Sequence, residues 1–170
     1  KTTTAAKKTD PPTAVVAATP SPTIKPSPTE STKVTEYSIE MDFQIDQGYF
    51  SFVFGALDPA NYLLWQINLV DFAGEEKVTF KPHTCIDGVF EVIEQPEINN
   101  VIKWEDRLEP HKIKVTISDK NEVTTYIDDV KVHTYTHEYA EYGIFGFRAC
   151  ADEGYYVDNI VIKDTKTDKV

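Results

Sequence analysis

The chain has 170 residues and a formal net charge of −11, which is unevenly distributed. Residues 1–34 carry five lysines against Asp10 and Glu30, or +3, so the other 12 basic and 26 acidic residues give the remainder −14. Nucleic acids and anionic lipid surfaces bind to positively charged protein surfaces. The strongly acidic composition of residues 35–170 therefore argues against both as partners. No run of about 18 apolar residues exists, so no membrane span is predicted.

Residues 1–34 are dominated by Pro, Thr, Ser and Ala and contain no aromatic residue. Such a segment cannot bury enough surface to offset its chain entropy, so we expect a disordered Pro/Thr-rich linker, with a generic disordered tail as the alternative. It contains no secretory signal, and we expect the chain to be a monomeric module of a larger protein. We expect one folded domain over residues 35–165, a length typical of a single domain, and a short tail over residues 166–170.

From residue 35 onward, apolar and polar residues alternate with period 2, and turn residues separate the alternating runs. No convincing helical pattern is present. Strands are predicted, in chain order, over residues 35–45, 49–56, 61–70, 77–84, 88–94, 111–118, 122–128, 130–136, 142–150 and 154–163. Regular short strands with turns between them favour an all-β fold, a two-sheet antiparallel β-sandwich of the jelly-roll kind.

The segment NYLLWQIN is the most informative of these strands. Strand side chains alternate between two faces, so Leu63, Trp65 and Ile67 point one way. Gln66 and Asn68 point the other way. Amides opposite an apolar row are unusual on a plain solvent-facing strand, and a row of hydrogen-bond donors and acceptors suits a sugar-binding sheet.

Three pairs of segments carry a resemblance to a known superfamily: SFVFGA with DPANYLLWQIN, PHKIKV with TTYIDDVKV, and YGIFGFRA with YYVDNIVI. Over residues 36–163 the chain resembles concanavalin A-like and laminin-G-like β-sandwich domains, including levan-binding-type carbohydrate-binding modules of secreted bacterial glycosidases. The first 34 residues look like linkers in such secreted proteins. The resemblance implies sugar binding at the concave sheet or its rim, although a shared fold does not settle function.

The same alternation places five polar side chains on one outward face if Trp65 lies in the core. They are the candidate ligand-binding residues Gln66, Asn68, Lys81, His83 and Arg148. The Arg fork and the amides suit neighbouring sugar hydroxyls. Two alternatives stay open: these are ordinary solvated strand positions, or Arg148 is paired with a structural carboxylate.

Two tryptophans invite a stacking hypothesis, because sugar rings pack on indole faces. Trp65 belongs to the apolar row and is expected in the core. Trp104 lies in the polar segment KWED and is a further candidate ligand contact.

The resemblance also implies a structural calcium ion, held partly by an Asp of the last strand, and the matching position is Asp158. Calcium takes six to eight oxygen ligands, which acidic turns supply. No EF-hand signature is present. Solvated turn acids are the alternative interpretation.

Catalysis is not expected. A retaining glycosidase needs two carboxylates about 5 Å apart. Laminarinase-type relatives of the superfamily carry Glu-x-Asp-x-Glu on one strand, whereas this chain has Glu40, Asp42 and then Gln44, which cannot protonate a leaving group. No Ser/His/Asp or Cys/His order has motif support.

The chain has two cysteines, Cys85 and Cys150, whose spacing decides neither for free thiols nor for a disulfide. The predicted function is extracellular, non-catalytic recognition of a polysaccharide or oligosaccharide that targets a parent protein to it. A laminin-G-like adhesion domain and an unusual glycoside hydrolase are the alternatives.

Overall fold

The structure is a computed structural model that describes residues 36–72, 75–142, 144–150 and 153–167. The predicted linker over residues 1–34 lies outside the described residues, as do residues 168–170 of the predicted tail. Both therefore stay predictions.

Ten strands and two short 3-10 helices form in the described part of the chain. The strands are β1 (Tyr37–Gln47), β2 (Tyr49–Asp58), β3 (Asn61–Phe72), β4 (Glu75–Ile86), β5 (Val89–Val92), β6 (His111–Ile117), β7 (Glu122–Ile127), β8 (Val130–Thr136), β9 (Ile144–Phe147) and β10 (Gly154–Asp164). The helices are η1 (Trp104–Asp106) and η2 (Glu138–Glu141). No helix among the residues described is both long and apolar enough to cross a membrane.

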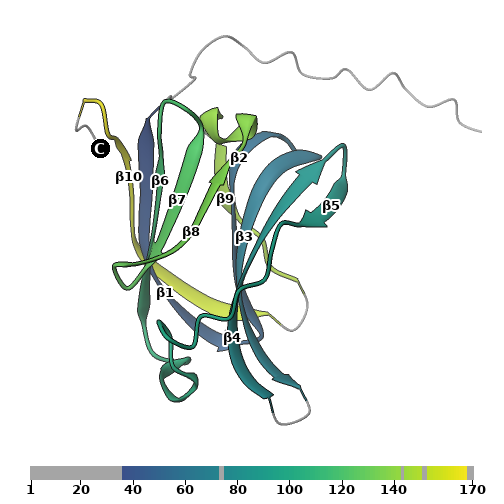
Figure 1. Cartoon of the computed structure of the whole chain (residues 1–170), viewed down its shortest axis with the longest axis vertical. Helices are drawn as coiled ribbons and strands as arrows, with labels where there is room; N and C mark the ends of the chain where they lie inside the picture. The colour runs from purple at the N-terminus through teal and green to yellow at the C-terminus, as the bar shows by residue number, and fades with distance from the viewer. Residues whose placement is uncertain (1–35, 73–74, 143, 151–152, 168–170) are drawn as a thin grey trace, which may run out of the picture.

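The strands form two five-stranded sheets that face each other (Figure 1). Sheet 1 has the order β10-β1-β6-β7-β8 and sheet 2 the order β5-β4-β3-β2-β9, and neighbouring strands pair antiparallel in both. The predicted antiparallel β-sandwich is thus confirmed.

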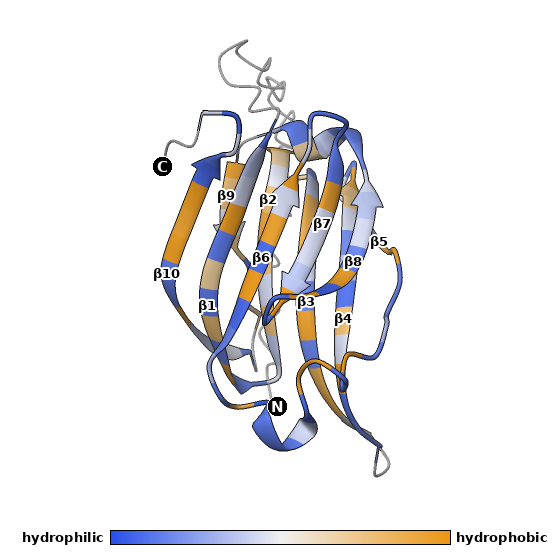
Figure 2. Cartoon of the chain, turned by 60° about the vertical axis from the view of Figure 1, so that its left-hand side comes forward, coloured by the Kyte–Doolittle hydropathy of each residue, from blue (hydrophilic) through white to orange (hydrophobic). Residues whose placement is uncertain are grey.

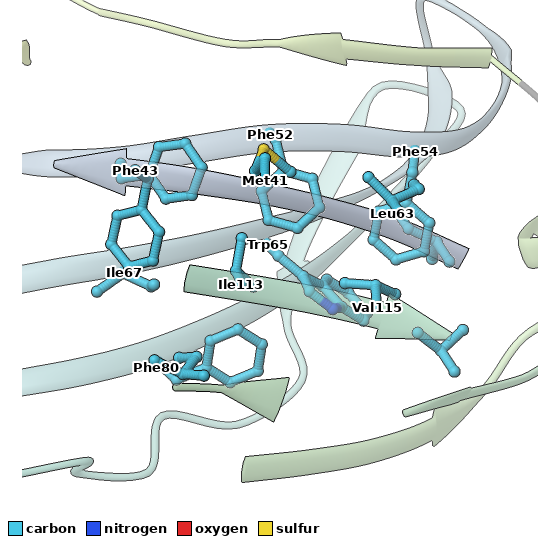
Figure 3. Packing of buried hydrophobic residues seen from close by; sticks show 14 of the residues in the cluster. Met41, Phe43, Phe52, Phe54, Leu63, Trp65, Ile67, Phe80, Ile113 and Val115 are labelled. Carbon is cyan, nitrogen blue, oxygen red and sulfur yellow. The ribbon is translucent and has the colours of Figure 1, made fainter. Parts of the chain in front are cut away.

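The core lies between the sheets and consists of the inward side chains of both. In Figure 2, apolar and polar segments alternate along β6, as a strand with one buried face requires. Figure 3 shows how the aromatic residues of sheet 2 pack against aliphatic residues of sheet 1, such as Ile113 and Val115. Trp65 is fully buried, and its indole Nε1 donates a hydrogen bond to Thr125 Oγ1 across the two sheets at 2.8 Å.

The pairing of β2 is irregular where this strand approaches η2. Gly55 has φ +58°, and the pairing of β2 with β3 shifts register in this stretch. A Cβ atom on Gly55 would lie 2.5 Å from the carbonyl oxygen of Tyr139, so only glycine fits there. Tyr37 of β1 donates from its hydroxyl to the carbonyl of Ala140 at 2.9 Å, which fastens η2 to sheet 1 as well. η2 therefore links both sheets at one end of the sandwich.

Candidate functional site

The outer face of sheet 2 brings together the polar residues that alternation predicts there. Because Trp65 and its row fill the core, the intervening residues of β3 point outward. Antiparallel pairing places Gln66 opposite Lys81, and Asn68 opposite Thr79. We call this surface the polar face; its outward side chains are Ser51, Val53, Tyr62, Leu64, Gln66, Asn68, Thr79, Lys81, His83, Cys85, Phe90 and Arg148, around the bare backbone of Gly146.

The amides of the polar face are more buried than outward strand positions usually are. Gln66 is 8% exposed and Asn68 is 5% exposed. Gln66 Nε2 donates to Ser51 Oγ at 3.3 Å, so neighbours on the same face pack side by side. Both residues are thus shielded from solvent, unlike ordinary solvated strand residues.

Three buried polar atoms of this face have no hydrogen-bond partner among the described residues: Asn68 Oδ1, Thr79 Oγ1 and His83 Nδ1. Leaving a buried polar group unpaired costs about 1–3 kcal/mol, so each such group calls for an explanation. Binding sites are one place where unpaired groups are retained, because a ligand or an ordered water completes them.

The surroundings of His83 favour its neutral form. Burial lowers its pKa and the nearby positive charges of Lys81 and Arg148 lower the pKa further, while the backbone of Lys81 and of Leu64 opposes the shift. A neutral imidazole has one N–H donor and one acceptor nitrogen, which is the combination a hydroxyl group can use.

Arg148 follows β9 and reaches over the polar face. Its guanidinium carbon lies 5.5 Å from the centroid of the Phe90 ring. Among the described residues it forms no ion pair with a carboxylate, and Glu153, one candidate for a structural partner, accepts the backbone N–H of Cys150 instead. The arginine is therefore held on this face by an aromatic ring rather than by an acid.

A pocket of about 590 Å³ adjoins Arg148 at the end of the polar face formed by β2, β3 and β9. It is lined by Val53, Ala56, Asp58, Pro59, Tyr62, Ile144, Phe145, Gly146, Phe147, Arg148 and Ala149. A Cβ atom on Gly146 would meet nothing within 4 Å, so the space above this glycine is open. The volume lies in the range of small-molecule sites.

Trp104 does not join the polar face. It begins η1, packs against the edge of the core, and carries the Arg107 guanidinium 4.0 Å from its ring centroid. Arg107 thus covers one face of the indole that would otherwise be free for stacking. Trp65 lies in the core as expected.

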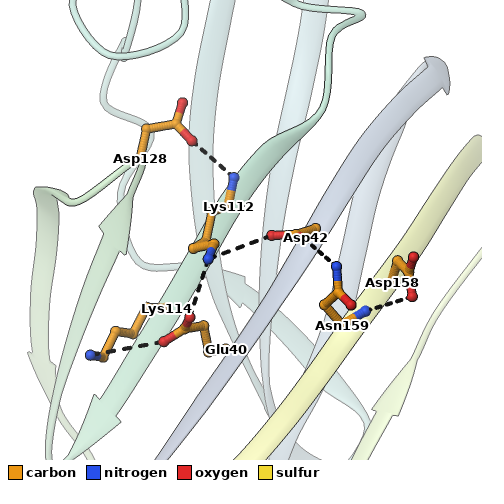
Figure 4. A network of polar contacts seen from close by, with 7 residues as sticks. All are labelled: Glu40, Asp42, Lys112, Lys114, Asp128, Asp158 and Asn159. Carbon is orange, nitrogen blue, oxygen red and sulfur yellow. Dashed lines mark hydrogen bonds and ion pairs between the residues drawn. The ribbon is translucent and has the colours of Figure 1, made fainter.

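Asp158 lies on the outer face of sheet 1, in the polar network of Figure 4. It accepts the backbone N–H of Asn159 at 2.7 Å, and the Asn159 side chain donates to Asp42 Oδ2 at 2.7 Å. In the part of the chain that the structure describes, no group of three or more His, Cys, Asp or Glu side chains could hold a metal ion. These residues do not form a cage for calcium by themselves, and the calcium ion stays a prediction.

The acidic pair that resembles part of a glycosidase motif lies in the same network on sheet 1. Glu40 Oε1 is 3.4 Å from Lys112 Nζ, and Asp42 Oδ1 is 3.9 Å from the same nitrogen. Gln44 donates to the carbonyl of Leu108 at 2.8 Å. Lysines balance both carboxylates, on the sheet opposite the pocket.

Both cysteines are free: Cys85 is buried on the polar face, beside Tyr62, and Cys150 is exposed. No disulfide therefore links β4 to the segment after β9.

Sequence reasoning missed three residues of the polar face as site candidates. Thr79 is outward by alternation, and its unpaired hydroxyl depends on neighbours that only the fold reveals. Tyr62 and Phe90 contact each other with ring centroids 5.8 Å apart, because β5 pairs with β4. Period 2 could have placed Tyr62, whereas Phe90 required the strand pairing.

Comparisons with known proteins show the fold. Sheep galectin-11 in complex with glycerol matches with a TM-score of 0.54 and 9% identity, over 75% of this chain and 90% of that chain. CG-16, a homodimeric agglutinin from chicken liver, matches with a TM-score of 0.51 and 17% identity over the same shares. The CBM2 module of the evolved Dit of Lactobacillus casei BL23 phage J-1 matches with a TM-score of 0.50 and 11% identity, over 78% of this chain and 62% of that chain.

No protein-family model and no curated protein matches the chain. The solved structures nevertheless match the two-sheet fold of this chain over three quarters or more of its length. The chain therefore has a concanavalin A-like β-sandwich fold, as the sequence resemblance predicts.

Proposed function

We propose that this domain binds carbohydrate on the polar face of sheet 2 and performs no catalysis. The observation that carries the proposal is the open pocket beside Arg148, next to a row of buried polar groups that lack partners among the described residues. The proposal extends to an extracellular module that targets a larger protein to a polysaccharide. Such tethering raises the effective concentration of the attached protein at the glycan.

The chemistry of the polar face suits sugar hydroxyls. A hydroxyl both donates and accepts, and it can satisfy an amide, an imidazole or a threonine hydroxyl. The amides of Gln66 and Asn68 and the neutral ring of His83 offer such mixed capacity, while Arg148 offers donors only. Tyr62 and Phe90 add aromatic surface for the apolar face of a sugar ring.

The similar structures add support from the fold. They include galectins, an agglutinin and a CBM2 module, which share this sandwich at low identity. This likeness makes carbohydrates the first ligand class to test, although a shared fold does not determine the binding residues.

Absence of catalysis is proposed because the polar face provides no pair of acids. The outward side chains that make up the polar face include no Asp or Glu. Asp58 is the one carboxylate among the residues that line the pocket, and it accepts hydrogen bonds from the backbone N–H of Ala60 and the side chain of Asn61. Glycoside hydrolysis by the usual routes needs two carboxylates across one bond.

A glycan array tests the proposal, followed by titration calorimetry with the best ligand and the variant Gly146→Val. A valine Cβ there meets no neighbour and the residue suits a strand, so the fold should persist while the added side chain occupies the space directly above Gly146. We expect binding to be lost in Gly146→Val and kept in Thr134→Val, a control on the outer face of sheet 1. No binding to any glycan, or unchanged binding by Gly146→Val, would reject the proposal. Capture of a protein instead would favour the adhesion alternative.

A further inference from the structure

The charge of the polar face is opposite to that of the domain. The whole chain carries −11, yet the charged side chains of the polar face are Lys81 on β4 and Arg148 just after β9, both cations. The carboxylate of Asp58, which also lines the pocket, accepts hydrogen bonds from the backbone N–H of Ala60 and the side chain of Asn61. Lys77, farther along β4, lies 3.0 Å from Glu75 and 3.8 Å from Glu97, so its charge is balanced. The polar face therefore has a positive end next to the pocket.

Neither Lys81 nor Arg148 has a carboxylate partner among the described residues, and both are half-buried. Other lysines without an ion pair in the described part of the chain are exposed, where water solvates the ammonium: Lys103, Lys120, Lys131 and Lys163. Partly desolvated cations usually have an anionic partner, because losing water costs a charge more than it costs a neutral group.

The contact between Arg148 and Phe90 leaves the arginine ready for an anion. The contact with the Phe90 ring, 5.5 Å from the guanidinium carbon to the ring centroid, gives the five N–H donors no hydrogen-bond acceptor. Among the described residues the guanidinium donates no hydrogen bond. Its planar fork matches the two oxygens of a carboxylate.

Both charges act on the same side chain, since Lys81 and Arg148 each lower the pKa of His83. The two cations thus share one region of the polar face, and an anion placed there would be attracted by both.

We propose that the glycan bound on the polar face is acidic, with uronic acid residues whose carboxylate is bound by Arg148 and Lys81. The inference rests on the proposed function and narrows its ligand class. The sugar ring lies over Gly146, where the surface is open, and its carboxylate points toward the two cations.

The test compares three uronate polymers, polygalacturonate, alginate and glucuronan, with the carboxyl-reduced form of each. A polysaccharide that carries sulfate groups but no carboxylates is the second comparison. We expect at least one uronate polymer to bind about tenfold or more tightly than its reduced form, because hydrogen bonds to charged groups are the strong ones. Binding should weaken as salt is raised. Arg148→Gln should abolish the preference for the carboxylate, Lys81→Gln should reduce it, and Lys131→Gln on sheet 1 is the charge-matched control.

The failures are distinguishable. If the charged and reduced polymers bind equally well, and Gly146→Val abolishes both, the proposal of an acidic ligand is rejected and the proposal of carbohydrate binding stands. A preference for the sulfated polymer would show that the two cations bind an anion, and would reject a carboxylate as that anion. No binding to any polymer would overturn both proposals. NMR titration of the His83 ring gives a second readout: a bound carboxylate should raise its pKa, whereas a reduced polymer should not.

Discussion

Two threonine-to-valine substitutions measure whether unpaired groups on the polar face lower the stability of the fold. Thr79 lies on β4 with a buried hydroxyl that has no partner among the described residues, whereas Thr125 lies on β7 and its hydroxyl accepts the indole N–H of Trp65 at 2.8 Å. Both residues are buried strand positions, at 5% and 0% exposure. The gain from valine's strand preference and apolar surface is therefore similar at both sites.

The two substitutions should differ because of the hydrogen bond alone. Thr125→Val leaves the Trp65 N–H buried without an acceptor, which costs about 1–3 kcal/mol. Thr79→Val removes an unpaired hydroxyl, so we expect the free energy of unfolding to stay the same or rise by about 1 kcal/mol. For a domain of this size, 1 kcal/mol corresponds to roughly 3–5 °C in melting temperature.

Urea denaturation followed by tryptophan fluorescence, with thermal melting by circular dichroism, measures both variants. Thr125→Val should unfold at lower urea and Thr79→Val at the same or higher urea, with equal slopes. If both variants lose stability to within about 0.5 kcal/mol of each other, the Thr79 hydroxyl is satisfied in solution and unpaired groups no longer mark this face.

Three further predictions concern the rest of the fold. Gly55→Ala should lower the free energy of unfolding more than Gly88→Ala, because both glycines have positive φ but only at Gly55 would an added Cβ lie 2.5 Å from a backbone oxygen. We expect a loss of about 1 kcal/mol from backbone strain at Gly88. Equal losses of stability in urea denaturation would contradict the close approach of η2 to Gly55. Burial lowers the pKa of His133, with the Glu94 charge opposing; the unfolded chain therefore takes the proton first, and the free energy of unfolding should fall as pH drops below about 6.5. The slope of stability between about pH 7 and 5.5 should be smaller in His133→Gln, and an unchanged slope would contradict this. If calcium is bound near Asp158, EDTA should lower the melting temperature of the wild-type chain by several degrees and that of Asp158→Asn by less; an unchanged wild-type curve would remove the ion.

The fold and the face of each polar residue were predictable because one physical regularity governs both. Side chains on a strand alternate, and a fully apolar row must face the core. The row that contains Trp65 therefore fixes the outward direction of Gln66 and Asn68 without knowledge of any neighbour. The same regularity in KVTFKPHT directs Lys81 and His83 outward.

Cross-strand neighbours were not predictable from the pattern. Alternation does not state that Gln66 would be shielded by Ser51, nor that Phe90 would lie beneath Arg148, because strand register and pairing decide these contacts. Period 2 also says nothing about the segment with Trp104, which has no repeating pattern. There, an arginine three residues later covers the indole.

The ninth strand shows a third limit. Sequence alternation suggests a strand over residues 142–150, whereas pairing with β2 extends only over Ile144–Phe147. β9 is an edge strand with one partner, and the register shift in β2 near Gly55 shortens the ladder that it can join. The shorter strand leaves Arg148 just beyond the ladder, next to the pocket.

Chemical-shift mapping by NMR tests the central claim most directly. An oligosaccharide from the best glycan in the array would be added to the isotope-labelled chain, and the side-chain amides of Gln66 and Asn68 and the Arg148 guanidinium would be followed. We predict that these signals shift and saturate together, while those of Lys112 and Lys114 on sheet 1 stay in place. Shifts confined to sheet 1, with the polar face unchanged, would contradict the site.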